Sequence, residues 1–245
     1  VVAGDGCLME GISHEALSLA GHLKLKNLIM LFDNNSISID GPTSLAVSDN
    51  YKKRFESYGW NYIEIDGHNE KQIFKAIKKA QSSKKPTTIS CKTIIGFGSP
   101  NKSGKAAAHG SPLGADEIEL VRKKLKWKYK PFEIPNDILN EWRKIGSKGV
   151  KEEKKWKKKY LKKIPKEKSL SQLSKLIEFE KKSAIKNLKS IATRKSSEQA
   201  LTTLTNKFQN LIGGSADLAG SNNTKTKNHK IIKPGNFKGN YIHYG

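Results

Sequence analysis

Short apolar runs alternate with longer amphipathic stretches along the first hundred residues of the chain. Val1–Ala3 predicts the end of a buried strand, and a helix is predicted from about Met9 to Leu25, where apolar residues recur every three or four positions. The continuous apolar run over residues 28–32 predicts a second strand, buried on both faces. Two strands joined by a helix in this way should lie parallel in one sheet.

A second strand–helix–strand unit follows, with strands predicted over residues 60–65 and 87–93 and a helix over 70–80. Alternating units of this kind predict an α/β fold with a doubly wound, mostly parallel sheet. The stretch Gly96–Gly114 contains seven glycines and prolines, which is typical of a long loop that serves binding more often than packing.

The rest of the chain changes character twice. From about residue 115 to 189 the pattern is helical with breaks near Pro131, Pro135 and Pro165, which predicts peripheral helices and a linker. Near residue 191 a globular pattern resumes, with a helix predicted over 196–205 and a strand end at 211–212 before a glycine-rich turn. We therefore predict a first domain with peripheral helices, a linker, and the truncated beginning of a second α/β domain, over residues 1–160, 161–190 and 191–245.

The net charge of +23, from 46 Lys and Arg against 23 Asp and Glu, is the most unusual feature of the composition. It raises the alternative of a basic nucleic-acid-binding module, whose DNA binding would depend steeply on salt. Only four of the basic residues are arginines, which favour bidentate readout of bases and phosphates, and the lysines are interleaved with glutamates in stretches such as 151–154. We therefore predict solvated faces of mixed charge and no nucleic-acid partner.

Other features bear on the compartment. No apolar run approaches the ~20 residues that span a bilayer, so no membrane partner is predicted. The chain opens with Val1–Gly4 rather than with a methionine or a signal peptide, which indicates a start within a longer protein. Cys7 and Cys91 are too few and too far apart for a disulfide framework, which is typical of a reducing compartment. We expect a cytoplasmic protein.

Two polar residues mark the ends of the first two predicted strands: Asp5 follows the first, and Asn35 follows the second. Ligands of an open parallel sheet bind beyond the carboxyl ends of its strands, where these side chains should meet. Carboxylate and amide oxygens suit Mg²⁺, which takes further ligands from water and substrate phosphates. Gly4 and Gly6 would let backbone N–H groups approach a diphosphate near the positive start of the next helix. The alternative interpretation is a tight turn with a solvated Asp5.

The Gly4-Asp5-Gly6 sequence, followed at this spacing by Asn34-Asn35, resembles the thiamine-diphosphate signature, in which an Asp, an Asn and a nearby carbonyl hold magnesium on the cofactor diphosphate. Further segments are similar to the transketolase family, in the same order along nearly the whole chain and most weakly across its lysine-rich middle. These segments are Gly4–Ala16, Ser36–Gly41, Arg54–Trp60, Ile65–His68, Cys91–Lys102, His109–Gly114, Trp127–Phe132, Thr193–Lys195, Gly213–Leu218 and Gly239–Gly245.

This resemblance implies a metal site made by Asp5, Asn35 and the carbonyl oxygen of Ile37, with Gly6 and Asn35 contacting the diphosphate. The implied cofactors are thiamine diphosphate and Mg²⁺, for which Ca²⁺ or Mn²⁺ could substitute. His109 would be a catalytic acid–base group that faces both cofactor and substrate. Without the resemblance, His109 is equally well explained as a loop histidine that caps a carbonyl.

The resemblance also implies substrate and partner contacts. Arg194 and Ser221 match positions that bind a sugar phosphate, a task suited to a cation and a hydroxyl. Asp217 lies where the family places a carboxylate near the thiazolium ring of the cofactor. Glu10 and Glu15 match carboxylates near the interface of a homodimer that has its active site between the subunits.

The implied activity is that of a transferase of the pentose phosphate pathway, which moves a two-carbon ketol unit from a ketose phosphate to an aldose phosphate. A dihydroxyacetone synthase is an alternative within the thiamine enzymes. A deoxyxylulose-phosphate synthase is another, which the segments Cys91–Lys102 and His109–Gly114 disfavour.

Two departures from the family pattern limit what the chain should do alone. Ala106 stands where the family carries a histidine three residues before His109, which puts one acid–base or phosphate contact in question. Substrate-channel histidines are expected before Val1, and the glutamate that activates the aminopyrimidine is expected after Gly245. We therefore expect these 245 residues by themselves to be an inactive fragment.

Overall fold

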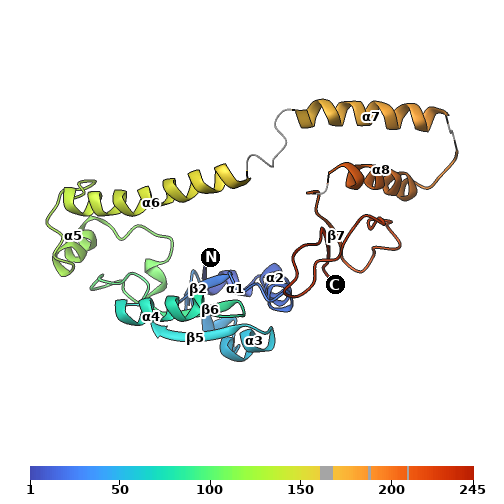
Figure 1. The fold of residues 1–245 in the computed structure, drawn as a ribbon. Coiled ribbons are helices and arrows are strands. Elements are labelled where there is room, and N and C mark those ends of the chain that lie inside the picture. The colour runs from blue at the N-terminus through green and yellow to red at the C-terminus, as the bar shows by residue number, and fades with distance from the viewer. Residues whose placement is uncertain (161–167, 187–188, 209) are drawn as a thin grey trace. The chain divides into compact units, whose positions relative to one another are not determined.

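The computed structural model describes residues 1–160, 168–186, 189–208 and 210–245, and the chain divides into two units (Figure 1). Unit 1 and unit 2 each combine segments from distant parts of the sequence. Unit 1 consists of Val1–Trp127, Gln209–Ala219 and Asn228–Gly245, and unit 2 of Lys128–Phe208 and Gly220–Lys227. The predicted domain limits at residues 160 and 190 stay a prediction.

Unit 1 is built on a four-stranded sheet. In spatial order its strands are β1 (Val2–Gly4), β2 (Ile29–Asn34), β6 (Thr87–Lys92) and β5 (Asn61–Asp66). All three neighbouring pairs are parallel, with Gly4 opposite Asp33 and Asp33 opposite Cys91, so the carboxyl ends of the strands meet at one edge. The predicted α/β fold with a parallel sheet is confirmed.

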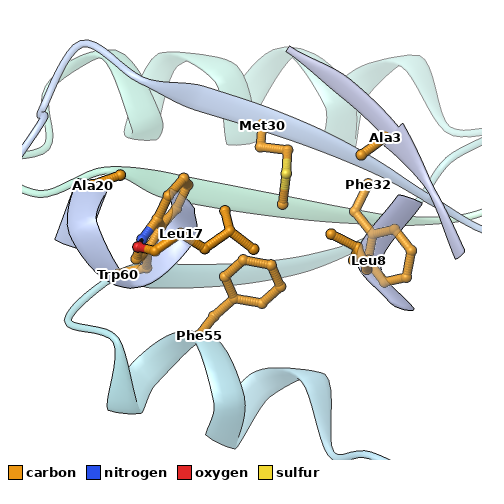
Figure 2. Close-up of a cluster of buried hydrophobic side chains, with 8 residues drawn as sticks. All are labelled: Ala3, Leu8, Leu17, Ala20, Met30, Phe32, Phe55 and Trp60. Atoms are coloured by element: carbon orange, nitrogen blue, oxygen red, sulfur yellow. Dashed lines mark hydrogen bonds between the residues drawn. The ribbon is translucent and has the colours of Figure 1, made fainter. Parts of the chain in front are cut away.

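One face of the sheet packs against α1 (Asp5–Met9), α2 (Gly11–His22) and α3 (Tyr51–Ser57). Trp60 donates a hydrogen bond from its indole nitrogen to the Leu17 carbonyl oxygen at 2.8 Å, which fixes α2 in place. Between the sheet and these helices lies a cluster of buried hydrophobic side chains (Figure 2). Its members are Ala3, Leu8, Leu17, Ala20, Met30, Phe32, Phe55 and Trp60.

The approach of α2 to the end of α3 is unusually close at Gly21. A Cβ atom added there would lie 1.7 Å from the Tyr58 carbonyl oxygen, so no side chain fits at this position. The two helices therefore meet backbone to backbone.

The other face of the sheet packs against α4 (Glu70–Gln81), whose Ala76 and Ala80 lie in one cluster with Ile65 and Ile89. Leu31 of β2 packs against this cluster, whereas Met30 and Phe32 of the same strand belong to the opposite face, as the alternation of side chains along a strand requires. Helices on both faces make the sheet doubly wound, as predicted.

The predicted boundaries of the first helix are wrong. The structure has two helices there, because Glu10 is extended, with a ψ of 138°. The first of them begins directly at Asp5, which therefore lies in a helical turn rather than in a loop. The second ends at His22, and the left-handed φ of 54° at Lys24 stops it short of the predicted end at Leu25.

Several short elements between β2 and β5 are absent from the expectations drawn from the sequence. β3 (Ile37–Ser38) and β4 (Gly41–Pro42) form a small antiparallel pair, and the 3₁₀ turn η1 (Thr43–Leu45) precedes α3. Elements of two or three residues are too short to produce a hydrophobic period. The start of α3 is capped by Asn50, whose side chain accepts a hydrogen bond from the Lys53 N–H at 2.9 Å.

The remainder of unit 1 follows β6. The long loop contains the 3₁₀ turn η2 (Ala106–Ala108) and leads into α5 (Ala115–Lys124). Near the end of the chain, β7 (Gly213–Ser215) and β8 (Tyr241–His243) form a parallel pair. The strand end predicted at residues 211–212 thus lies just before β7, which begins at Gly213 and ends at Ser215.

Unit 2 contains α6 (Asn136–Tyr160), α7 (Lys168–Lys186) and α8 (Thr193–Lys207), which confirms the predicted helical character of this part. The predicted break near Pro165 lies outside the described residues. Exposed ion pairs within a turn of α6, such as Lys155 with Glu152 at 2.7 Å, show the mixed charge expected of a solvated face.

The helices that the structure describes include none with both the length and the apolar character needed to cross a membrane. Cys7 and Cys91 are both free thiols.

Candidate functional site

Asp5 is a buried carboxylate at the carboxyl edge of the sheet. It follows β1 directly, begins α1, and has only 4% of its surface exposed. Its Oδ2 accepts a hydrogen bond from the Ser36 backbone N–H at 3.2 Å, whereas its Oδ1 is buried and has no partner among the described residues. An unpaired buried carboxylate oxygen is costly, so its position favours a bound ligand.

Burial raises the pKa of Asp5 above its ordinary value of 3.8. The backbone N–H groups of Ser36 and Asn35 lower this pKa, the Asp33 carboxylate raises it, and the Lys92 ammonium lowers it, but burial is the largest of these effects. A cation at the unpartnered oxygen would favour the ionised carboxylate and offset the cost of its burial.

Asn35 and Ile37 lie in the turn that follows β2. Ser36 between them has a left-handed φ of 62°, which turns its N–H toward Asp5. The Oδ1 of Asn35 accepts a hydrogen bond from the Ile37 N–H at 3.0 Å, and its Nδ2 donates to Asp33 Oδ2 at 3.3 Å. Because an amide oxygen has two lone pairs, Asn35 Oδ1 retains one acceptor site.

A cavity of about 330 Å³ opens beside Asp5. Asn34 reaches it from a buried position, where its Nδ2 donates to Ser90 Oγ at 3.1 Å and its Oδ1 accepts from Lys92 Nζ at 3.3 Å. The cavity is lined by Asp5, Asn34, Ser36, Pro42, Thr43, Ser44, Val47, Asp49, Tyr51 and Lys92.

Five residues of the predicted metal and cofactor site are not among those that line this cavity. These are Gly6, Asn35, Ile37, His109 and Asp217. Asn35 is nevertheless adjacent, because its backbone N–H faces the Asp5 carboxylate. Gly6 is exposed in α1, and a Cβ atom there would meet no atom within 4 Å, so the space next to this backbone is open.

His109 follows η2 in the long loop. Its backbone N–H donates to the Ala106 carbonyl oxygen at 2.8 Å, and its Nδ1 is buried without a hydrogen-bond partner among the described residues. The flanking Gly104 and Gly110 have φ angles of 72° and 70°, a left-handed conformation that favours glycine. One ring nitrogen of the imidazole is therefore left without a protein partner in the described part of the chain.

Glu117 of α5 anchors the loop that carries His109. Its carboxylate accepts hydrogen bonds from the Ser99 hydroxyl, from the Asn101 N–H at 2.9 Å and from Asn101 Nδ2 at 2.8 Å. These bonds lower the pKa of Glu117 to about 2, and the bond from Ser99 has the largest effect. The carboxylate is therefore ionised at neutral pH. The sequence pattern gave no role to Glu117; its signal was an acidic residue in the first turn of a helix that follows Gly114.

Arg194 and Ser221 come together in unit 2, at a cavity of about 640 Å³. The buried hydroxyls of Thr205 and Thr226, 3.1 Å apart, join α8 to the segment that carries Ser221. The cavity is lined by Ile191, Ala192, Arg194, Lys195, Gly220, Ser221 and Asn223. The Arg194 guanidinium, a hydroxyl and the first turn of a 15-residue helix are suited to an anion, whereas the Lys195 ammonium is paired with the Glu198 carboxylate.

Asp217 follows β7 in unit 1 and has a left-handed φ of 55°. It is exposed and is not among the residues that line either of the two cavities described here. Its predicted place near a cofactor ring stays a prediction.

Two family models match the chain: the transketolase thiamine diphosphate binding domain over residues 1–179 and the transketolase pyrimidine binding domain over residues 189–245. Among curated proteins, the transketolase of Buchnera aphidicola subsp. Acyrthosiphon pisum is 48% identical, and that of Rhodobacter capsulatus is 44% identical. These alignments cover 100% of this chain but 39% and 38% of the two relatives, so the chain spans about two fifths of their length.

Solved structures give the same result. Transketolase from Leishmania mexicana matches with a TM-score of 0.84 at 35% identity, covering 100% of this chain and 38% of that one. Pichia stipitis transketolase in complex with sedoheptulose-7-phosphate matches with a TM-score of 0.82 at 35% identity, covering 100% of this chain and 39% of that one. With its first 179 residues matched by one family model and nearly all the others by a second, the chain belongs to the transketolase family.

Proposed function

We propose that the full-length protein is a transketolase, which transfers a two-carbon ketol unit from a ketose phosphate to an aldose phosphate with thiamine diphosphate and Mg²⁺. The observation that carries the proposal is the buried, unpartnered Asp5 Oδ1 at the carboxyl edge of the sheet, within the matched thiamine diphosphate binding domain. The relatives and the solved structures are named transketolases, which favours this function over a dihydroxyacetone synthase, a deoxyxylulose-phosphate synthase or a nucleic-acid-binding module.

The residues beside Asp5 fit a Mg²⁺ ion bound to a diphosphate. Asp5 Oδ1 has no other partner, Asn35 Oδ1 keeps one lone pair, and the Ile37 carbonyl would be the third protein oxygen. Within the described ranges, no three side chains of His, Cys, Asp and Glu gather as a metal site, so neutral oxygens would have to complete the ligand set of a cation at Asp5. Mg²⁺ accepts such a set when water and phosphate oxygens complete it, and Ca²⁺ or Mn²⁺ would bind the same oxygens.

When bound, thiamine diphosphate supplies the reactive carbon that carries the two-carbon unit. The chain's own residues would position the groups and move protons. His109, with its unpaired Nδ1, would exchange a proton with a substrate oxygen, and Glu117 would hold the loop that presents it. Ala106 has no titratable group, so His109 supplies the imidazole of the loop over residues 96–114. Asp217 would lie near the cofactor ring.

Arg194 and Ser221 would bind the phosphate of the sugar substrate. The support is their joint position at one cavity, together with Lys195 and the first turn of α8. A guanidinium forms strong, directional hydrogen bonds with phosphate oxygens, and a hydroxyl can donate one more.

We also propose a homodimer with the active site at its interface. Glu10 and Glu15, assigned to that interface by family resemblance, are exposed on the segment that follows Asp5 and are therefore accessible to a second subunit.

We propose the following domain limits: a diphosphate-binding domain with peripheral helices over residues 1–160, a linker over 161–190, and the beginning of a pyrimidine-binding domain over 191–245.

Removing and restoring the two cofactors tests the proposed activity. Full-length protein freed of metal with a chelator and of organic cofactor by dialysis should transfer no ketol unit between a ketose phosphate and an aldose phosphate. Thiamine diphosphate added with Mg²⁺ should restore transfer, and each added alone should not. Transfer that persists after complete removal, or that is never seen with the cofactors present, would contradict the proposal.

Gly6→Ala separates folding from cofactor binding. A methyl group at Gly6 meets no atom within 4 Å, so this variant should fold and be at least as stable as the parent protein, measured by denaturant unfolding. The same methyl group would occupy the space assigned to the diphosphate. Binding of inorganic pyrophosphate with Mg²⁺, measured by calorimetry, should therefore weaken by about tenfold or more, a loss of ~1.4 kcal/mol.

Gly11→Ala is the matched control, because a Cβ at Gly11, the first residue of α2, also meets no atom within 4 Å. It should leave pyrophosphate affinity unchanged. Equal pyrophosphate affinity in both variants would show that Gly6 does not face the diphosphate.

A further inference from the structure

A second buried polar atom without a partner belongs to the cavity beside Asp5. The hydroxyl oxygen of Tyr51 is buried, has no hydrogen-bond partner among the described residues, and belongs to a side chain that lines this cavity. A buried hydroxyl left unpaired costs ~1–3 kcal/mol. An unpaired acceptor, Asp5 Oδ1, and an unpaired hydroxyl at one cavity indicate a bound group that satisfies both.

The ring of Tyr51 is held firmly in place. Phe32 packs edge-on against it with ring centroids 4.8 Å apart, and the Arg54 guanidinium lies 5.2 Å from its centroid. Arg54 in turn donates hydrogen bonds to the Leu8 carbonyl oxygen at 2.8 Å and to Asp49 Oδ2 at 2.9 Å. Because Leu8 is in α1, Arg54 ties α3 to the helix that begins with the proposed metal ligand.

The hydroxyl of Tyr51 keeps its hydrogen at neutral pH and can therefore donate a hydrogen bond. Burial, followed by the charge of Asp5, raises the pKa of Tyr51, and the charge of Arg54 acts in the opposite direction. The phenol is therefore protonated at neutral pH and can give its hydrogen to an oxygen of the bound group. Asp5 can interact with the same group through a cation.

We propose that Tyr51 is part of the cation site, where its hydroxyl forms a hydrogen bond with an oxygen that is itself bound to Mg²⁺. That oxygen belongs either to a diphosphate, to which the hydroxyl donates, or to a water molecule, from which the hydroxyl accepts because a water bound to Mg²⁺ acts as a donor. This role rests on the proposed function, since it requires the cation at Asp5. It assigns Tyr51 to ligand binding and explains why a tyrosine with an unpaired hydroxyl faces a polar cavity.

Calorimetric titration of the metal-free, full-length protein with Mg²⁺ alone, and with Mg²⁺ plus inorganic pyrophosphate, tests this role. Tyr51→Phe keeps the ring and removes the hydroxyl, so it should fold normally and be at least as stable as the parent protein without metal. Its Mg²⁺ affinity should fall about five- to tenfold, the value of one hydrogen bond. Tyr58→Phe is the control, because the Tyr58 hydroxyl pairs with His14 Nδ1 at 3.1 Å and its ring packs on the same core cluster.

The two titrations distinguish the sources of the oxygen. Weaker binding of Mg²⁺ alone would identify a water ligand, and weaker binding only with pyrophosphate would identify a diphosphate oxygen; either result supports the role of Tyr51. Unchanged affinity in both titrations would overturn it, provided that Asp5→Ala loses Mg²⁺ binding. If Asp5→Ala binds Mg²⁺ normally, the metal site of the proposed function fails and the role of Tyr51 fails with it.

Discussion

Asp5→Asn is expected to make the metal-free protein more stable and to abolish its response to Mg²⁺. The carboxylate is buried with one unpaired oxygen, so neutralising it should raise the free energy of unfolding at neutral pH by ~1–3 kcal/mol. The loss of the charged ligand should weaken Mg²⁺ binding at least a hundredfold, about 2.7 kcal/mol. Urea unfolding without metal and thermal unfolding with Mg²⁺ plus thiamine diphosphate measure the two effects.

The stability that Asp5→Asn gains over the parent protein should depend on pH. Burial raises the pKa of Asp5 in the folded protein above its ordinary value of 3.8. Below that value the carboxyl is protonated in both the folded and the unfolded state, so the variant should have little advantage there. As the pH rises, the unfolded state releases the proton first and the parent protein loses stability relative to Asp5→Asn, until the folded pKa is passed and the difference becomes constant.

Asp66→Asn is the matched control at the same edge of the sheet. Asp66 ends β5 and is exposed, and its Oδ1 accepts a hydrogen bond from the His68 N–H at 2.9 Å. This variant should keep the full response to Mg²⁺. A metal-free Asp5→Asn protein that is less stable than its parent, or one still stabilised by Mg²⁺ to the same extent, would contradict the assignment of Asp5.

Arg194→Leu is expected to raise the KM for a phosphorylated ketose by about ten- to a hundredfold and to change kcat much less. A hydrogen bond to a charged group contributes ~1.5–3 kcal/mol, and in the proposed reaction the phosphate would lie away from the bond that is cleaved. An interaction that binds substrate and transition state equally affects KM rather than kcat. Steady-state kinetics with a ketose phosphate and with the same ketose lacking the phosphate measures the effect, which should be confined to the phosphorylated donor.

Arg143→Leu removes the same charge from an exposed position on α6 in the same unit. It should leave both donors unaffected. An equal rise of KM for phosphorylated and unphosphorylated donors in Arg194→Leu would show that Arg194 does not contact the phosphate, and an equal effect of Arg143→Leu would point to the general positive charge of the chain.

The sheet and the position of Asp5 could be predicted because both depend on local pattern. Apolar runs at the right spacing specify parallel strands, and a residue placed directly after such a strand has to lie at the carboxyl edge. Family resemblance identified Arg194 and Ser221, and the structure brings them to one cavity. The pairing of Thr205 with Thr226 joins the two segments that carry them, and no periodicity encodes it.

Tyr51 and Glu117 could not be predicted because their roles depend on tertiary contacts. Tyr51 lies 46 positions from Asp5 and reaches the cavity through α3, a helix of seven residues, too short for a clear hydrophobic period. Glu117 acts through hydrogen bonds to Ser99 and Asn101, 18 and 16 positions away along a loop. Glycine-rich segments indicate that a loop exists, but they do not specify which acidic side chain closes it.

The contact of α2 with α3 at Gly21 has a consequence for how the proposed cation site tolerates changes of sequence. Two peptide groups, rather than two side chains, set the separation of these helices, and peptide dimensions are the same in every sequence. Substitutions that enlarge or shrink neighbouring core residues therefore cannot readily shift α3 relative to α2. We therefore expect Tyr51, which lies on α3, to keep its position relative to α2 when neighbouring core residues change, as long as position 21 carries no side chain.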